Sequence, residues 1–158
     1  MDSVFERGWI DERLATLVAM ADKEADGAEA LFRGDEASHM RLAESRIIQA
    51  AQVVEAKVTL RVVTQDAEAR ASTTDLTDAG LRRCVDLALS RAKAAPRAEE
   101  PIHLAMPQDI PAPPARALHL PTAALDGETK SRWLAEACRA HEADDLSLAG
   151  RFHSGLNT

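Results

Sequence analysis

The chain has 158 residues, a formal net charge of −7 and only 3% aromatic residues, which suits one domain whose core is built from Leu, Val, Ile and Ala. The acidic balance and the lack of clustered Lys and Arg argue against a nucleic-acid partner. The N-terminus holds no apolar run and no stretch is long enough to span a bilayer, so we expect no signal peptide, no membrane partner and a cytoplasmic location.

The first elements in chain order are a helix and two strands. Asp11 can cap a helix that runs to about Glu24, because short polar side chains satisfy the first free N–H groups of a helix. Residues 28–33 predict a strand, Gly34-Asp35 interrupt it, and residues 37–43 predict another. The predicted helix has one apolar face at helical spacing, made of Leu14, Leu17, Val18, Ala21 and Ala25.

Residues 46–55 are ambiguous on local pattern. Their apolar side chains fit one helical face, and Ser45 could cap such a helix. The periodicity therefore favours a helix, although the segment follows two predicted strands. The apolar residues concerned are Ile47, Ile48, Ala51 and Val54.

Residues 57–64 and 67–73 predict two strands joined by a tight turn at Gln65-Asp66. In the first strand, Val58, Leu60 and Val62 alternate with polar residues, which is typical of a strand with one buried face. In the second, small residues alternate with polar ones. A sheet face made of such small residues leaves room for a helix to lie close.

The second half predicts two helices, a proline-rich connection and a last strand. Thr77 can cap a helix that runs to about Ala95, and Pro96 ends it. Residues 97–124 hold six of the seven prolines, and Pro96 is the seventh, so we expect an extended connection in which residues 102–106 pack against the rest of the domain. A third helix over 128–141 and a strand over 146–152 follow. This order predicts an α+β fold with a mostly antiparallel sheet and two or three helices packed on it.

Candidate chemistry-bearing side chains are few. A metal site from His141, Glu142, Asp144 and His153 is conceivable, but a histidine at a helix C-terminus among solvated acids is the favoured interpretation. His39, His103 and His119 have no partner at ligand spacing.

The two cysteines, Cys84 and Cys138, each fall in a helical pattern. Arg82 and Arg83 could lower the pKa of Cys84, but two reduced, buried packing thiols are the favoured interpretation. The sequence contains no phosphate loop, serine elbow or CxxC pair. We therefore assign no catalytic, cofactor-binding or metal-binding residue.

Several short segments occur in a fixed order along the chain. They are SRIIQ at 45–49, LRVV at 60–63, ASTTDLTDAGLRRCVDLA at 71–88, MPQ at 106–108 and LAGRFHSG at 148–155. In this order they resemble the N-terminal domain of the TldD/PmbA (TldE) family, once called modulators of DNA gyrase. The family usually has Gly where this chain has Asp66-Ala67 and Ala69-Arg70, so its turn geometry must differ or be strained.

The resemblance implies that residues 46–55 form a strand and that the sheet is curved. It also implies that residues 1–158 are a non-catalytic N-terminal domain that helps form a peptide-access cavity and pairs with a homologous subunit. In TldD-type members an HExxxH motif in a β-rich C-terminal domain holds zinc. That motif and domain are absent from this chain, so we expect no cofactor here and no activity of the chain alone.

The sequence leaves two alternatives open. The chain could be a stand-alone relative that acts as a protein-interaction module without proteolysis, and the coding sequence beyond Thr158 would separate this from a domain of a longer protein. The parent could be TldD-like or PmbA-like. In either case, apolar surface that normally faces a second domain predicts self-association of the isolated chain.

Overall fold

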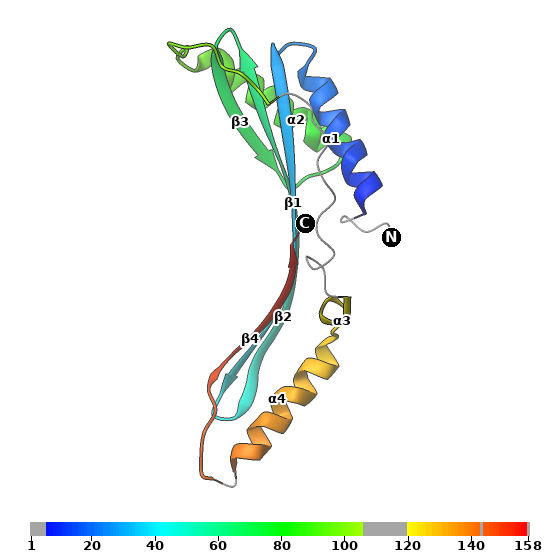
Figure 1. Ribbon diagram of the computed structural model, residues 1–158, viewed down its shortest axis with the longest axis vertical. Helices are drawn as coiled ribbons and strands as arrows, with labels where there is room; N and C mark the ends of the chain where they lie inside the picture. Colours follow the sequence, from blue (N-terminus) through cyan, green and yellow to red (C-terminus); the bar gives the residue numbers. More distant parts are fainter. Residues whose placement is uncertain (1–5, 106–119, 143, 158) are drawn as a thin grey trace. The chain divides into compact units, whose positions relative to one another are not determined.

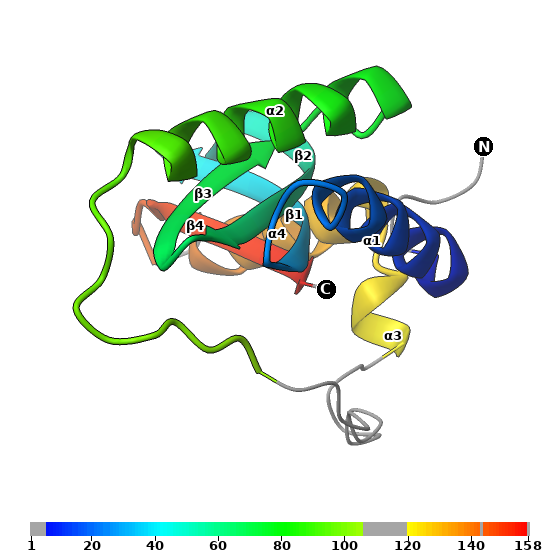
Figure 2. The same cartoon turned by 90° about the horizontal axis from the view of Figure 1, so that it is seen from above.

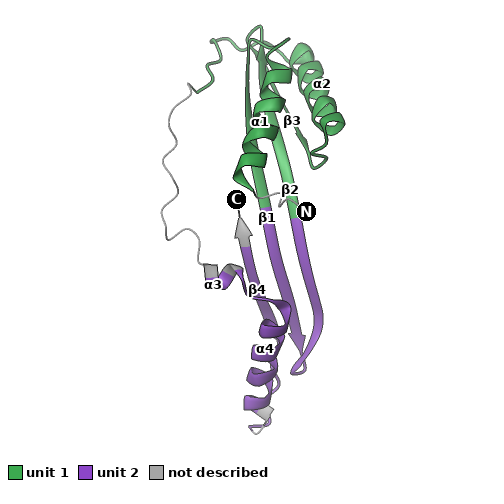
Figure 3. Ribbon diagram, turned by 90° about the vertical axis from the view of Figure 1, so that its right-hand side faces the viewer, with its two compact units in different colours: residues 1–34, 55–109, 158 green, residues 35–54, 110–157 purple. Residues whose placement is uncertain are grey.

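The computed structural model describes residues 6–105, 120–142 and 144–157. The described chain divides into two compact units (Figure 3): unit 1 holds residues 6–34 and 55–105, and unit 2 holds residues 35–54, 120–142 and 144–157. The elements are α1 (Arg7–Ala21), β1 (Gly27–Ala43), β2 (Arg46–Thr64), β3 (Ala67–Thr73), α2 (Asp78–Ala94), α3 (Leu120–Ala123), α4 (Gly127–Glu142) and β4 (Gly150–Asn157).

The four strands form one sheet in the order β3-β2-β1-β4. Both the β1–β4 pair and the β2–β3 pair are antiparallel. The predicted α+β class, with a mostly antiparallel sheet and helices packed on it, is therefore confirmed. The division between the two units crosses β1 and β2, so the parts of each strand are described with the unit to which they belong.

Unit 1 packs α1 and α2 on one face of its strands (Figures 1 and 2). The alternation predicted for β2 is confirmed, because Val58, Leu60 and Val62 are fully buried. Opposite them in the register lie small side chains of β3, such as Ala71 facing Leu60, which let α2 approach closely. The α2 residues of this core are Leu81, Cys84, Val85, Ala88, Leu89 and Ala92.

The predicted start of α2 is also confirmed. The Thr77 hydroxyl accepts a hydrogen bond from the Gly80 backbone N–H at 3.2 Å, and Asp78 places a negative charge in the positive first turn. Asp78 also accepts a hydrogen bond from Arg13 of α1 at 2.6 Å. Cap, dipole and ion pair together fix where α2 begins.

The other face of the unit 1 strands is polar. Arg61 donates to Glu29 at 2.9 Å and also to Glu68, which lies diagonally across the β2–β3 pair. Thr59 and Ser72 share a hydrogen bond of 2.8 Å between their hydroxyls. Cross-strand pairs of this kind stabilise a sheet face that does not pack against a helix.

Two element predictions were wrong, and the helical periodicity of a third segment was misleading. α1 begins at Arg7, so Asp11 lies inside the helix, and the N-cap residue Glu6 makes no side-chain cap. β1 runs without a break through Gly34-Asp35. Residues 46–55 are strand and not helix, which confirms the expectation from the family resemblance. Ser45 therefore caps no helix and instead lies in the turn between β1 and β2.

Both hairpin turns use non-glycine residues in the left-handed region. Glu44 and Ser45 have φ of 50° and 54°, and Gln65 and Asp66 have φ of 51° and 60°. The strain expected at Gln65-Asp66 from the missing glycine is therefore present. Hydrogen bonds hold that turn, since the Asp26 carboxylate accepts from the Gln65 backbone N–H at 2.6 Å.

The rest of the second half differs from prediction in detail. Of the predicted connection, residues 106–119 lie outside the described residues, while Leu120–Ala123 form the short helix α3. The connection packs against the rest of unit 1 at Leu104, as expected, because the Leu104 side chain lies over Gly27. The third predicted helix is confirmed as α4. The last strand begins at Gly150 and not at residue 146.

None of the described helices is both long and apolar enough to cross a lipid bilayer.

Candidate functional site

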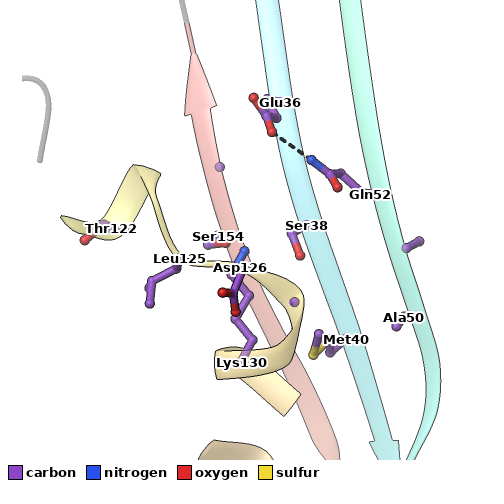
Figure 4. A pocket seen from close by; sticks show the side chains of 13 residues that line it. Glu36, Ser38, Met40, Ala50, Gln52, Thr122, Leu125, Asp126, Lys130 and Ser154 are labelled. Atoms are coloured by element: carbon purple, nitrogen blue, oxygen red, sulfur yellow. Dashed lines mark hydrogen bonds between the residues drawn. The ribbon is translucent and has the colours of Figure 1, made fainter. Parts of the chain in front are cut away.

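Unit 2 contains a pocket of about 470 Å³ between the sheet and the start of α4 (Figure 4). Its floor is the face of β1 and β4 that carries Ser38, Met40 and Ser154. Cross-strand pairing places Ser38 directly opposite Ser154. The wall is formed by the first turn of α4 and by the segment that precedes it. A pocket of this volume is large enough for a small ligand or the end of a peptide.

Lys130 is the one charged residue of the described chain that is buried, with 5% of its surface exposed. Its side chain points into the pocket, toward the side where Ser154 and Asp126 lie (Figure 4). The ammonium group makes no ion pair within 4.0 Å with a carboxylate of the described residues. Buried cations are costly unless paired, so Lys130 is the strongest single anchor for an anionic group in this pocket.

The carboxylates of the pocket already have partners. Asp126 accepts a hydrogen bond from the Thr129 backbone N–H at 2.6 Å and so caps α4. The Thr129 backbone N–H, its hydroxyl and the charge of Arg132 hold the pKa of Asp126 below its usual value. Glu36 accepts a hydrogen bond from the Gln52 amide at 2.8 Å. Neither group is free to serve as a general base without losing a structural contact.

The pocket offers no obvious catalytic pair. Its described lining includes the hydroxyls of Ser38 and Ser154 but no histidine or cysteine, and a serine nucleophile needs an adjacent base. The arrangement can bind and orient a polar group, with Lys130 as the cation. Sequence reasoning missed this pocket, because its lining comes from four separate segments of the chain, in β1, β2, β4 and residues 122–130.

The two histidines of the conceivable metal site lie on different elements, His141 on α4 and His153 on β4. His141 lies in the last turn of α4, where its Nδ1 is 2.9 Å from the Ala137 carbonyl. His153 lies on β4 and stacks against His39 of β1, with ring centroids 4.7 Å apart. His103 lies in the segment after α2, and His119 lies outside the described residues. Within the described ranges, no three His, Cys, Asp or Glu side chains lie close enough to hold a metal ion.

Both cysteines are free and buried. Burial raises the pKa of the Cys84 thiol, and this outweighs the opposing effects of the Leu60 backbone hydrogen bond and the Arg91 charge. The lowering of the pKa considered from Arg82 and Arg83 is therefore wrong. A thiol with a raised pKa is a poor nucleophile, which supports the packing interpretation.

A second candidate surface is the edge of β2 in unit 2. β3 pairs with β2 only from Val58 to Thr64, so residues 46–54, the part of β2 that belongs to unit 2, have no strand partner on that edge among the described residues. Four large apolar side chains of this segment are 37–56% exposed: Ile47, Ile48, Val53 and Val54. A long, apolar and unpaired edge is a template for pairing with another strand.

The apolar side chains of α4 are only partly buried. Cys138 is buried, but Trp133 is 46% exposed. The side of α4 that meets the sheet contains Lys130 and Cys138, which are two helical turns apart. Trp133 therefore adds a further exposed apolar side chain in unit 2.

Comparison with known protein families found one match. The sequence model described as PmbA/TldA metallopeptidase domain 1 matches residues 28–92. These residues run from β1 almost to the end of α2 and belong partly to unit 1 and partly to unit 2. No curated protein matches this chain.

Solved structures show the same fold at low sequence identity. TldE from Thermococcus kodakarensis aligns with a TM-score of 0.75 and 15% identity, covering 92% of this chain and 35% of that one. A protein from Bacteroides thetaiotaomicron named as a modulator of DNA gyrase aligns with a TM-score of 0.78 and 15% identity, covering 93% and 35%. A protein from Thermotoga maritima with the same name aligns with a TM-score of 0.64 and 16% identity, covering 92% and 38%. The chain thus spans about a third of the length of these structures.

Proposed function

We propose that this chain, whose residues 28–92 match the model of PmbA/TldA metallopeptidase domain 1, is a non-catalytic N-terminal domain of that family. In this role it pairs with a homologous subunit and helps to enclose a cavity that admits peptides. The proposal assigns no catalytic step to this chain. The described donor set does not fit a metal centre, so a metal required by the family would be bound by residues other than these.

The unpaired edge of β2 is the observation that carries the proposal. Backbone N–H and C=O groups along residues 46–54 are available for hydrogen bonds to an added strand. Ile48 and Val54, which are 56% and 55% exposed, would become covered when another chain lies there. An added strand satisfies the backbone groups, and covering apolar surface supplies about 25 cal/mol per Å².

Two occupants of this edge are consistent with the proposal. A strand of a second subunit would give pairing, and an extended peptide would give substrate capture. Both use the same backbone hydrogen bonds, because an added strand is bound through its main-chain N–H and C=O groups, whatever its sequence. The pocket at Lys130 lies in the same unit and can hold a polar end of such a chain.

Sedimentation velocity over a range of concentrations tests the proposal. We expect the purified chain to self-associate and the double variant Ile48→Lys/Val54→Lys to stay monomeric, since charges on an edge strand oppose pairing. Leu87→Lys is the matched control, because Leu87 is 44% exposed on α2 in unit 1 and should leave association unchanged. A wild-type chain that is monomeric at every concentration would contradict the proposal.

A further inference from the structure

The face of β1 and β4 opposite the Lys130 pocket carries an uninterrupted group of cationic and imidazole side chains. The register places Arg41 directly opposite Arg151 and His39 directly opposite His153. The residues that alternate with them, Met40 and its neighbours, point to the other face, where Met40 is buried. We call the four residues Arg41, Arg151, His39 and His153 the basic face.

The contacts within the basic face leave hydrogen-bond donors free. The Arg151 guanidinium donates to His39 Nδ1 at 2.8 Å, which requires that nitrogen to be unprotonated. Burial, followed by the charges of Arg151 and His153, lowers the pKa of His39, and this agrees with a neutral ring. One arginine thus uses an imidazole as its acceptor, although a guanidinium has five N–H donors.

The arrangement is unfavourable for the chain by itself. Like charges directly opposite each other destabilise a pair of strands. The chain has 26 acidic and 19 basic residues, yet no carboxylate of the described residues forms an ion pair with Arg41 or Arg151. Elsewhere, Arg13, Arg61 and Arg83 all have such a carboxylate.

The basic face also borders a hollow. A depression of about 750 Å³ is lined by His39, Arg41 and Arg151 together with the small residues Ala149 and Gly150. Small residues leave space beside the two guanidinium groups, and guanidinium groups bind carboxylates with paired hydrogen bonds. The shape and the charge therefore favour the same kind of occupant.

We propose that the basic face binds the carboxylates of an acidic, extended peptide segment. A peptide is favoured over a nucleic acid, because the net charge of −7 repels a long polyanion while a short segment with a few carboxylates can approach. The inference rests on the proposed function only in taking a peptide as the partner. It adds the chemistry that the partner must carry.

Fluorescence anisotropy with two labelled octapeptides tests the proposal. One alternates threonine and glutamate, and the other has glutamine in place of glutamate. We expect the full chain to bind the glutamate peptide more tightly, by about tenfold for two exposed charge contacts, with the preference falling as salt is added. The double variant Arg41→Gln/Arg151→Gln should bind both peptides equally.

Arg70→Gln/Arg82→Gln is the matched control, since it removes the same charge from exposed positions of unit 1 and should keep the preference. A second readout is the imidazole pKa by NMR, which should rise for His39 when the glutamate peptide binds and stay unchanged with the glutamine peptide.

Four outcomes would overturn the inference. Equal binding of the two peptides by the wild-type chain would refute selection of carboxylates by the basic face, but it would still be consistent with peptide binding as such. An equal loss of the preference for the glutamate peptide in both double variants would show that the preference comes from the overall charge of the chain and not from the basic face. Binding of single-stranded DNA in preference to the glutamate peptide would assign the face to a nucleic acid. Binding of neither peptide would overturn it too, and self-association through the β2 edge would still be judged by sedimentation.

Discussion

Gly80 is the residue whose replacement tests the packing of α2 most sharply. It lies in the first turn of α2, and a Cβ atom added there would stand 2.2 Å from the Asp75 carbonyl oxygen. Gly127 lies in the first turn of α4, where an added Cβ meets only the Met40 methyl at 4.0 Å. The two glycines have similar positions in their helices and differ in the space around them.

The expected magnitudes follow from these distances. Overpacking costs about 1–3 kcal/mol, and displacement of the Asp75 segment would also weaken the Thr77 cap, worth about 1 kcal/mol. The gain in helix propensity from Gly to Ala is at most about 1 kcal/mol. We therefore expect Gly80→Ala to destabilise the chain by about 1–3 kcal/mol, and Gly127→Ala to be neutral or stabilising by up to about 1 kcal/mol.

Urea denaturation followed by circular dichroism measures both changes. Tryptophan fluorescence adds a local report, because Trp9 lies on α1 in unit 1 and Trp133 on α4 in unit 2. The unfolding transition reported by Trp9 fluorescence should have its midpoint at a lower urea concentration in Gly80→Ala than in wild type. If Gly80→Ala were as stable as Gly127→Ala, the close approach of α2 to Asp75 would be refuted.

Three further predictions concern unit 1. Thr77→Ala should lower the free energy of unfolding by about 1 kcal/mol through loss of the cap, whereas Thr74→Ala, at an exposed position, should change it little in the same urea assay. The Thr77 hydroxyl and backbone N–H, with Arg83, lower the pKa of Asp75. The charged Asp75 carboxylate therefore stabilises the fold at pH values above the pKa that Asp75 has in the unfolded chain. This contribution is lost as the pH falls through the lower pKa of the folded chain. Stability measured between about pH 5 and about pH 3 should therefore fall less in Asp75→Asn than in wild type, and an equal fall would contradict this. Burial raises the pKa of Cys84, so iodoacetamide followed by mass spectrometry should modify it only after unfolding; rapid labelling of the native chain would show that the thiol is accessible.

The elements that sequence predicted well are those whose local pattern and burial agree. In β2, Val58, Leu60 and Val62 alternate because one face lies on the core. In α2, the cap at Thr77 and the apolar stripe point to the same boundaries. Local propensity and tertiary packing favour the same structure in these segments, so a single sequence is sufficient to find them.

Residues 46–55 show why the same reasoning fails elsewhere. This part of β2 is mostly exposed on both faces, so no buried face imposes an alternating pattern. Ile47, Ile48 and Val54 then fall by chance at helical spacing, while pairing with β1 determines the structure. Because this segment lies at an exposed edge of the sheet, it lacks the alternating pattern of a buried strand. For the same reason it is accessible to another chain and is the candidate interface.

The sites depend on contacts between distant segments. His39 and His153 lie on strands far apart in the sequence and meet only through the β1–β4 register. The Lys130 pocket is lined by residues of β1, β2 and β4 together with α4 and the segment before it. Sequence spacing cannot report such contacts, which is why His39 had no visible partner and Lys130 looked like an ordinary helix residue.

Hydrogen exchange along β2 tests the central claim most directly. Amides of residues 46–54 that point to the unpaired edge should exchange rapidly in dilute solution and become protected as the chain associates, because an added strand accepts their hydrogen bonds. Association that leaves these amides unprotected, or that protects only β4, would contradict the account.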